Sequence, residues 1–234
     1  MANVENTENT FLRKLDAGIR HGVLSQCERV HIEPLQVLHT KDEEEKFVYF
    51  PEDALLSLVI QMPDERSIEV VTVGKEGVMG LPVLWGADIL PAVSIGEVPG
   101  YALKVAAEPF RRIIEEHPAL NHALQLYCQA LFVLVGQGLA CNSLHSLEER
   151  CARWILMAYD RVSKNKIVLT QEILAQMLAV RRPAVTLAAG ALKRAGLIEY
   201  SRGVVTILDH NALEAAACGC YGIMKKAVNK LGSE

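Results

Sequence analysis

Two arginines beside a proline are the residues of this sequence best suited to recognition chemistry. Arg181 and Arg182 precede Pro183 within the stretch 170–206, TQEILAQMLAVRRPAVTLAAGALKRAGLIEYSRGVVT. An arginine can bridge O6 and N7 of a guanine, or pair with a phosphate, through parallel hydrogen bonds. Proline suits the first turn of a helix, where its missing N–H is not needed. The arginines are therefore predicted to begin a helix that reads DNA.

Two short helices and a turn must position these arginines. Thr170 is expected to cap the first helix, and residues 179–181 form the turn. The first helix buries apolar residues at helical spacing: Ile173, Leu174, Met177 and Leu178. The second buries Val185, Ala188, Ala189 and Leu192. Gly196 ends it, and runs 197–200 and 204–208 then predict a β-hairpin.

This order of elements is typical of a helix-turn-helix followed by a wing, whose second helix enters the major groove. Arg182 is the candidate guanine reader, while Lys193, Arg194 and Arg202 are placed to bind phosphates. The full predicted DNA-contacting set is Thr170, Gln171, Arg181, Arg182, Ala184, Thr186, Leu187, Gly190, Lys193, Arg194, Ser201 and Arg202. The alternative is an ordinary helical pair with a solvated basic face.

The segment resembles the winged helix of the Crp/Fnr family of bacterial transcription regulators, through TQEILAQMLAVRRPAVT and RAGLIEYSRGVVTI. The resemblance extends more loosely over the whole chain. It implies an α+β fold with an antiparallel β-roll of jelly-roll type, a long dimerisation helix and a C-terminal winged helix. Ala179 departs from the family's usual glycine. Leu187 replaces a base-reading arginine of several members, so a different target sequence is expected.

Three domains are predicted: an N-terminal arm and sensor roll over 1–117, a dimerisation helix and hinge over 118–143, and a DNA-binding domain with a tail over 144–234. The arm is residues 1–10. The roll rests on short β-prone runs at even spacing. These runs are 36–40, 47–50, 55–61, 68–73, 78–84, 92–95 and 101–105.

The roll resembles the cyclic-nucleotide-binding domain of the same family, and its weak candidate effector pocket is Gly77, Gly80, Val93 and Ser94. No Lys or Arg occurs between Lys75 and Lys104, although a buried phosphate needs a cation. We therefore expect no cyclic AMP or cyclic GMP in the usual pose. An uncharged or apolar ligand, or none, are the alternatives.

A long helix is expected from Pro118 to about Asn142, about 37 Å at 1.5 Å per residue. A 3.5-residue repeat favours a helix that pairs with its own copy. The predicted dimer interface is Leu120, Leu124, Tyr127, Leu131, Leu134, Gly138 and Cys141. The alternative is a core helix packed on its own roll. Ser146 and Glu149 form a capping box that opens the next helix, after a hinge at 143–146.

Charge is unevenly distributed, although the net charge is only −4. Residues 1–145 hold 11 Lys/Arg and 20 Asp/Glu, whereas residues 146–206 hold 10 and 5. The positive charge thus falls on the segment expected to meet phosphates. The longest purely apolar run, 130–135, is too short to cross a bilayer, and the N-terminus has no apolar signal region. A cytoplasmic protein is expected.

No catalytic or metal-binding pattern is apparent. The six cysteines include no CxxC, and only Cys27 lies in the region where some relatives hold an iron–sulfur cluster. The seven histidines show no metal-site spacing. The sequence therefore predicts no enzyme, no metal site and no cofactor, while haem or a redox effector stays open.

The expected partners are double-stranded DNA and a second copy of the chain, with RNA polymerase if the protein activates transcription. The alternative function is a ligand- or partner-binding signalling module whose winged helix contacts protein. Absence of salt-dependent DNA affinity would distinguish it. The tail after Asp209 is expected to be helical through Ala217 and then to loosen.

Overall fold

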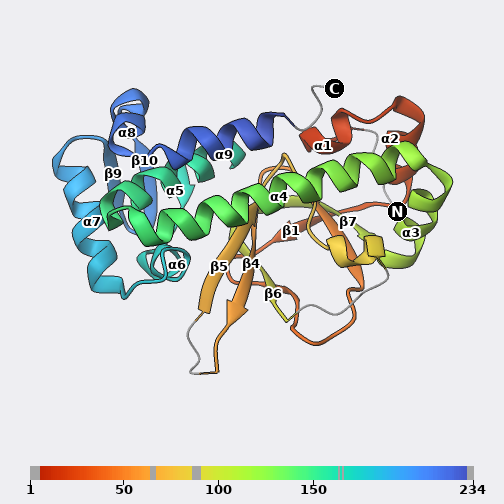
Figure 1. Cartoon of the computed structure of the whole chain (residues 1–234), viewed down its shortest axis with the longest axis horizontal. Coiled ribbons are helices and arrows are strands. Elements are labelled where there is room, and N and C mark those ends of the chain that lie inside the picture. Colours follow the sequence, from red (N-terminus) through yellow and green to blue (C-terminus); the bar gives the residue numbers. More distant parts are fainter. Residues whose placement is uncertain (1–5, 64–66, 86–90, 163, 165, 231–234) are drawn as a thin grey trace.

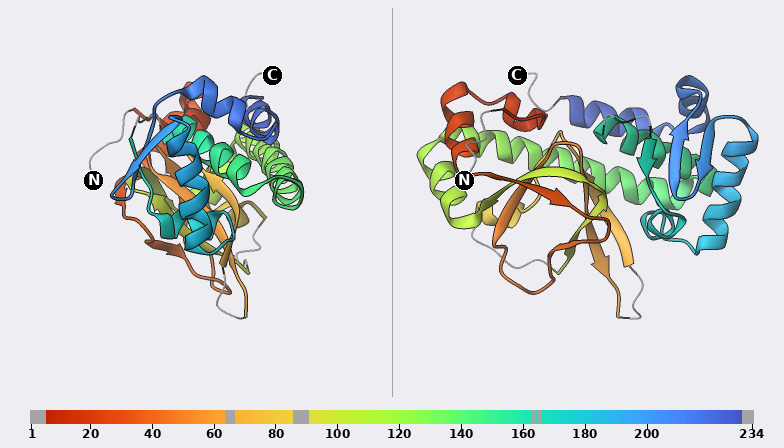
Figure 2. Two further views of the ribbon diagram at one scale, coloured as in Figure 1. Left: turned by 90° about the vertical axis from the view of Figure 1, so that its left-hand side faces the viewer. Right: turned by 180° about the vertical axis from the view of Figure 1, so that it is seen from behind.

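One long helix, α4 (Pro118–Leu144), runs past both halves of the molecule (Figure 1). The computed structural model describes residues 6–63, 67–85, 91–162, 164 and 166–230. A β-roll lies under the first part of α4, and a helical domain with a small sheet lies at its far end (Figure 2). This is the expected α+β architecture.

The roll consists of two antiparallel sheets. One has the order β1 (Glu28–Ile32), β7 (Gly100–Ala106) and β3 (Phe47–Pro51). The other has the order β2 (Val37–His39), β6 (Val93–Val98), β4 (Leu55–Gln61) and β5 (Ser67–Val73). Helices α1 (Thr10–Arg13), α2 (Ala17–Ser25) and α3 (Ala107–Glu116) close the end nearest the start of α4 (Figure 1).

The strand predicted at 78–84 was wrong. Met79 makes only an isolated bridge with Tyr49, and residues Leu81–Trp85 form the 3-10 helix η1. Gly80 has φ +101°, and Pro82 lacks the N–H that a strand ladder requires. Residues 64–66 and 86–90 lie outside the described residues.

The N-terminal arm is shorter than expected. Asn9 is fully buried, and its side-chain oxygen accepts the Leu12 N–H at 3.0 Å to cap α1. Its amide donates to the carbonyls of Pro51 and Gly77, at 2.9 and 3.0 Å. These bonds attach the chain to the roll from Asn9 onward, whereas residues 1–5 lie outside the described part.

The face of α4 predicted to be the dimer interface packs inside the protomer instead. Leu120, Leu124 and Tyr127 belong to a core shared with the roll and α3, while Leu134 packs on Val71 and Met224. Leu131 is half-buried beside both groups, Gly138 lies near Met224, and Cys141 is fully buried. The prediction failed because α4 is apolar on more than one side, so a 3.5-residue repeat does not reveal which stripe is covered.

A second stripe of α4 is exposed. Phe132 is 81% and Leu139 is 71% exposed, with Val135 between them. Cys128, Phe132, Val135, Leu139 and Asn142 recur at intervals of four and three residues, so they lie along one side of the helix. By length and composition α4 is also apolar enough to span a membrane, the only such helix among the described residues.

The C-terminal domain begins with α5 (Leu147–Val162), which is capped as predicted: the Ser146 N–H donates to Glu149 Oε2 at 2.8 Å. Its other elements are β8 (Lys166–Val168), α6 (Gln171–Met177), α7 (Arg182–Arg194), β9 (Ile198–Ser201), β10 (Val204–Ile207), α8 (His210–Ala216) and α9 (Cys220–Asn229). Helix α9 was not predicted from the sequence; it lies beside α4 and packs Met224 against it (Figure 1).

Charged and polar side chains join the roll to α5. Arg161 Nε lies 2.6 Å from Glu76 Oε1, and Trp154 Nε1 donates to Glu69 Oε2 at 3.3 Å. Glu97 lies near Glu69 and is fully buried. Loss of hydration, together with the negative charge of Glu69, holds the pKa of Glu97 well above its usual range.

Glu97→Gln is expected to stabilise the protein increasingly as pH rises. Above about pH 4.3, the unfolded chain loses the Glu97 proton while the folded chain keeps it. The wild-type free energy of unfolding therefore falls with pH, by up to about 1.4 kcal/mol per pH unit, until the raised folded-state pKa is reached. The neutral glutamine has no such dependence. Urea unfolding from pH 5 to 8 measures the difference; exposed Glu116→Gln is the control, and a constant difference would refute the prediction.

Candidate nucleic-acid interface

Helices α6 and α7 form the predicted helix-turn-helix. Thr170 caps α6, because its hydroxyl oxygen accepts the Ile173 N–H at 3.2 Å. Leu178 ends α6, and Pro183 lies in the first turn of α7. The predicted inner faces are buried in one core with α5: Ile173, Leu174, Met177, Leu178, Val185, Ala188, Ala189 and Leu192. This core fixes α7 relative to α6 and leaves its opposite face to solvent.

The turn between the helices is strained at Ala179, whose φ is +53°. A Cβ in this left-handed region costs about 1–2 kcal/mol, which glycine avoids. Ala179 therefore adopts, at a cost in strain, a backbone conformation that glycine adopts freely.

Ala179→Gly is expected to raise the free energy of unfolding by about 0.5–1 kcal/mol. Relief of the left-handed strain exceeds the greater chain entropy that glycine adds to the unfolded state. Chemical denaturation measures the change. Ala195→Gly is the matched control. Ala195 lies at the end of α7 with φ −75°, so glycine relieves no strain there and should lower the free energy of unfolding. Equal losses of unfolding free energy in Ala179→Gly and Ala195→Gly would contradict the prediction.

The exposed face of α7 carries the residues predicted to read bases. Gln171 Oε1 accepts the Thr186 hydroxyl at 3.0 Å and Arg182 Nε at 3.5 Å, so α6 orients both side chains. Leu187 is 71% exposed, which is unusual for a leucine and places its methyl groups on the same surface. Arg181 is exposed at the cap, whereas Ala184 and Gly190 are half-buried. Arg182, Thr186 and Leu187 thus form an ordered surface, which we call the α7 face.

The wing is a three-stranded sheet in the order β8-β10-β9, of which the sequence analysis missed β8. Arg202 and Gly203 form its two-residue turn, with φ of +51° and +73°, as a type I′ hairpin requires. Ser201 and Arg202 are exposed at the tip. Lys193 Nζ lies 2.6 Å from Glu199 Oε1, an ion pair that ties the end of α7 to β9. The Glu199 carboxylate therefore already compensates part of the Lys193 charge, whereas the sequence predicted that Lys193 would be free to bind phosphate.

The positive charge counted along the sequence is not all available to DNA. Arg150, Arg153 and Arg161 are buried in the domain or against the roll. Lys164 binds Asp53 of the roll, with 2.7 Å between Nζ and Oδ2. The exposed cations near the α7 face and wing are Lys166, Arg181, Arg182, Lys193, Arg194 and Arg202. The charge count by segment therefore overstated the basic surface, because it could not separate buried from exposed arginines.

The four residues proposed for an effector pocket do not line one cavity. A Cβ on Gly77 would collide with the Tyr127 hydroxyl, so this space is filled. Gly80 packs against the backbone of Phe47. Val93 and Ser94 are consecutive in β6, so their side chains point to opposite faces of the sheet. The predicted pocket is therefore wrong as a single site.

A different cavity, of about 160 Å³, lies between β5, α4 and α5. Glu69, Arg153 and Arg161 are its charged lining residues, and its apolar walls include Leu134 and Met157. The cavity was not predicted from the sequence, because its walls come from β4, β5, α4, α5, α6 and α9, which are distant from one another in the chain. Its position between roll and C-terminal domain allows a bound molecule to contact both.

Comparison with known proteins agrees with this architecture. Residues 149–216 match the family model of the Crp-like helix-turn-helix domain. No curated protein matches the chain in sequence. Among solved structures, a CRP-family transcriptional regulator from Thermus thermophilus superposes with a TM-score of 0.67 at 23% identity, covering 80% of this chain and 96% of that one.

Two further structures show the same arrangement. FixK2 from Bradyrhizobium japonicum gives a TM-score of 0.71 at 12% identity, covering 82% of this chain and 98% of its own. A CRP/FNR-family transcriptional regulator, also from Thermus thermophilus, gives 0.63 at 17% identity, covering 81% and 98%. Residues 149–216 are thus a Crp-like helix-turn-helix domain, and the chain as a whole has the fold of the Crp/Fnr transcription regulators.

Proposed function

We propose that the protein is a cytoplasmic transcription regulator that binds an inverted-repeat DNA site as a homodimer. The α7 face is the observation that carries this proposal. Its Arg182 and Thr186 are oriented by Gln171, and the exposed Leu187 lies beside them. Arginine suits guanine, and an apolar side chain suits the thymine methyl, so the surface has the chemistry of direct readout.

The exposed stripe of α4, not the predicted seam, is the proposed dimer interface. Phe132 and Leu139 leave a large apolar surface in contact with water, which single chains of soluble proteins seldom do. Two copies paired along this stripe would cover it without lipid. Such a dimer would present two α7 helices to successive major grooves about 34 Å apart.

Selection from random duplex DNA tests the proposal. Purified full-length protein is incubated with the library at near-physiological salt, and bound duplexes are sequenced over successive rounds. Enrichment of an inverted repeat is expected, with G-containing half-sites where Arg182 lies. Weak binding without enrichment would indicate that an effector or redox signal is required. Absence of any DNA binding would reject the proposal.

Cyclic AMP is expected not to bind. No Lys or Arg occurs between Lys75 and Lys104. A phosphate there would lack the cation that its burial requires. Isothermal calorimetry measures binding directly. Saturable binding of cyclic AMP, together with a shift in DNA affinity, would contradict the prediction and indicate a cyclic-nucleotide effector.

If an effector exists, the cavity between β5, α4 and α5 is better placed for it than the interior of the roll. An activator of transcription would additionally contact RNA polymerase. The alternative function is a signalling module whose winged helix binds protein. It predicts no salt-dependent DNA affinity, whereas contacts from the exposed arginines to phosphates predict affinity that falls steeply with salt.

A further inference from the structure

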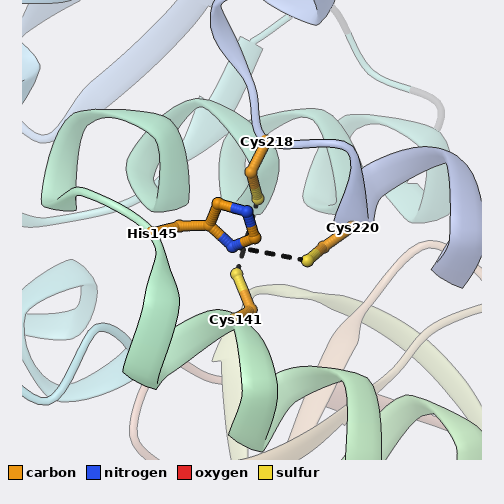
Figure 3. A group of neighbouring side chains, drawn as sticks. All are labelled: Cys141, His145, Cys218 and Cys220. Atoms are coloured by element: carbon orange, nitrogen blue, oxygen red, sulfur yellow. Dashed lines mark hydrogen bonds between the residues drawn. The ribbon is translucent and has the colours of Figure 1, made fainter.

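Four potential metal ligands meet where the end of α4 approaches the segment between α8 and α9 (Figure 3). Cys141 lies in the last turn of α4, and His145 follows that helix directly. Cys218 precedes α9, and Cys220 begins it. Their sulfur and ring-nitrogen atoms all lie within 4.8 Å of one another, and the three cysteines are buried.

The spacing of these atoms matches a single tetrahedral ion. Cys141 Sγ lies 3.4 Å from Cys218 Sγ, and Cys220 Sγ lies 3.6 Å from His145 Nδ1. With Zn–S bonds of about 2.3 Å and Zn–N bonds of about 2.0 Å, tetrahedral geometry places sulfurs about 3.8 Å apart and sulfur and nitrogen about 3.5 Å apart. In a [4Fe–4S] cluster each thiolate binds a different iron, so the thiolate sulfurs stand farther apart than around one ion.

We propose that Cys141, His145, Cys218 and Cys220 form a mononuclear zinc site. Three thiolates and one imidazole are a recurrent structural zinc set, with all four positions filled by protein. This replaces the expectation of no metal site. The cysteines showed no metal-ligand spacing in the sequence, because 77 residues separate Cys141 from Cys218 and only the fold brings them together.

The surroundings suit a loaded site. Gln137 Nε2 donates to Cys220 Sγ at 3.0 Å, an outer hydrogen bond that would orient this ligand. Zinc with three thiolates carries a charge of −1. Arg150 is buried close enough to Cys141 and Cys218 to interact with their charges, and its Nε has no hydrogen-bond partner among the described residues. Its positive charge would offset that of the site.

The site would bridge the hinge. Cys141 and His145 belong to the end of α4, whereas Cys218 and Cys220 follow the wing and α8 in the chain. A bound ion would therefore fix the C-terminal domain against the helix that carries the proposed dimer interface. The consequence for DNA rests on the proposed function: zinc would hold the two α7 helices of a dimer at one spacing.

Cobalt substitution tests the site without DNA. Reduced, metal-stripped full-length protein is titrated with Co²⁺ in the absence of oxygen. One Co²⁺ per chain is expected, with the intense visible bands of tetrahedral coordination and a thiolate charge-transfer band, both abolished by an equivalent of Zn²⁺. Cys218→Ser and His145→Ala should weaken binding at least about 100-fold, and Gln137→Leu about 10-fold.

Cys128→Ser is the matched control, because Cys128 is a half-buried cysteine of α4 outside the group, and it should bind Co²⁺ like the wild type. His145→Ala keeps the test valid if a cysteine variant fails to fold, since His145 is only half-buried. An octahedral spectrum, or bands that survive in His145→Ala and Cys218→Ser, would overturn the proposal. Iron with acid-labile sulfide in anaerobically purified protein would also overturn it, in favour of a cluster.

DNA affinity is measured separately, with and without Zn²⁺, on the selected site. If Zn²⁺ changes DNA affinity only in proteins that keep all four ligands, the zinc site also regulates DNA binding. Tetrahedral Co²⁺ binding in a chain that binds no DNA would uphold the zinc site while the proposed function fails. The two proposals therefore fail independently.

Discussion

Phe132→Glu is expected to separate the protein into monomers and to abolish tight binding to an inverted repeat. Phe132 is 81% exposed in the single chain, and the proposed interface would bury it. Burial of such a side chain contributes about 1.5–3 kcal/mol, and two-fold symmetry repeats each loss in the partner. A dimer dissociation constant at least about 100-fold higher follows, before any repulsion between the two introduced carboxylates. Sedimentation equilibrium measures it.

The control is Val37→Glu, an apolar-to-acidic change at an exposed position of β2 on the roll. It should leave both the mass and the DNA affinity unchanged. Leu139→Glu should reproduce the effect of Phe132→Glu, because Leu139 lies two turns along the same stripe. A dimer that persists in both α4 variants would place the interface elsewhere. If the wild type is monomeric and binds lipid vesicles, the stripe is a membrane surface and the homodimer proposal fails.

Arg182→Ala is expected to weaken binding to the selected site about 10–100-fold and to relax base choice within each half-site. A bidentate arginine–guanine contact is worth about 1–3 kcal/mol of discrimination. Gln171 and Thr186 hold the α7 face in place, so truncation of Arg182 removes one reader without disturbing the helix. Repeating the selection with the variant measures specificity, and fluorescence anisotropy measures affinity.

Arg194→Ala provides the comparison, because Arg194 is exposed in the last turn of α7, where phosphate contacts are expected. It should weaken all duplexes about equally and reduce the salt dependence of binding. Lys193→Ala should act in the same direction but more weakly, since Glu199 already pairs with the lysine. Unchanged specificity in Arg182→Ala would show that Arg182 binds backbone and not bases.

Under the proposed function, contacts between the roll and the C-terminal domain would carry an effector signal to the helix-turn-helix. Arg161 pairs with Glu76, and Trp154 donates to Glu69, both across this boundary. A cavity lies between the same elements, and the group of Cys141, His145, Cys218 and Cys220 lies at the hinge. A ligand or metal ion acts through such contacts only by binding one arrangement of the domains more tightly than another.

Local features of the sequence determined the helix-turn-helix. Its signals all depend on residues within a few positions of one another. They are the cap at Thr170, the apolar spacing of α6 and α7, the proline at the start of α7 and the glycine that follows α7. Backbone geometry and helical periodicity act over that same range, so the pattern was readable. The capping box at Ser146 and most strands of the roll were readable for the same reason.

Three features were decided only by the tertiary structure. The first is which stripe of α4 is buried. Both stripes are apolar, and packing against the roll and α9 buries only one of them. The second is the burial of Arg150, Arg153 and Arg161, which removes their charge from the DNA-facing surface. The third is the meeting of Cys141 with Cys218. Each depends on contacts between residues far apart in the chain, and local spacing carries no information about such contacts.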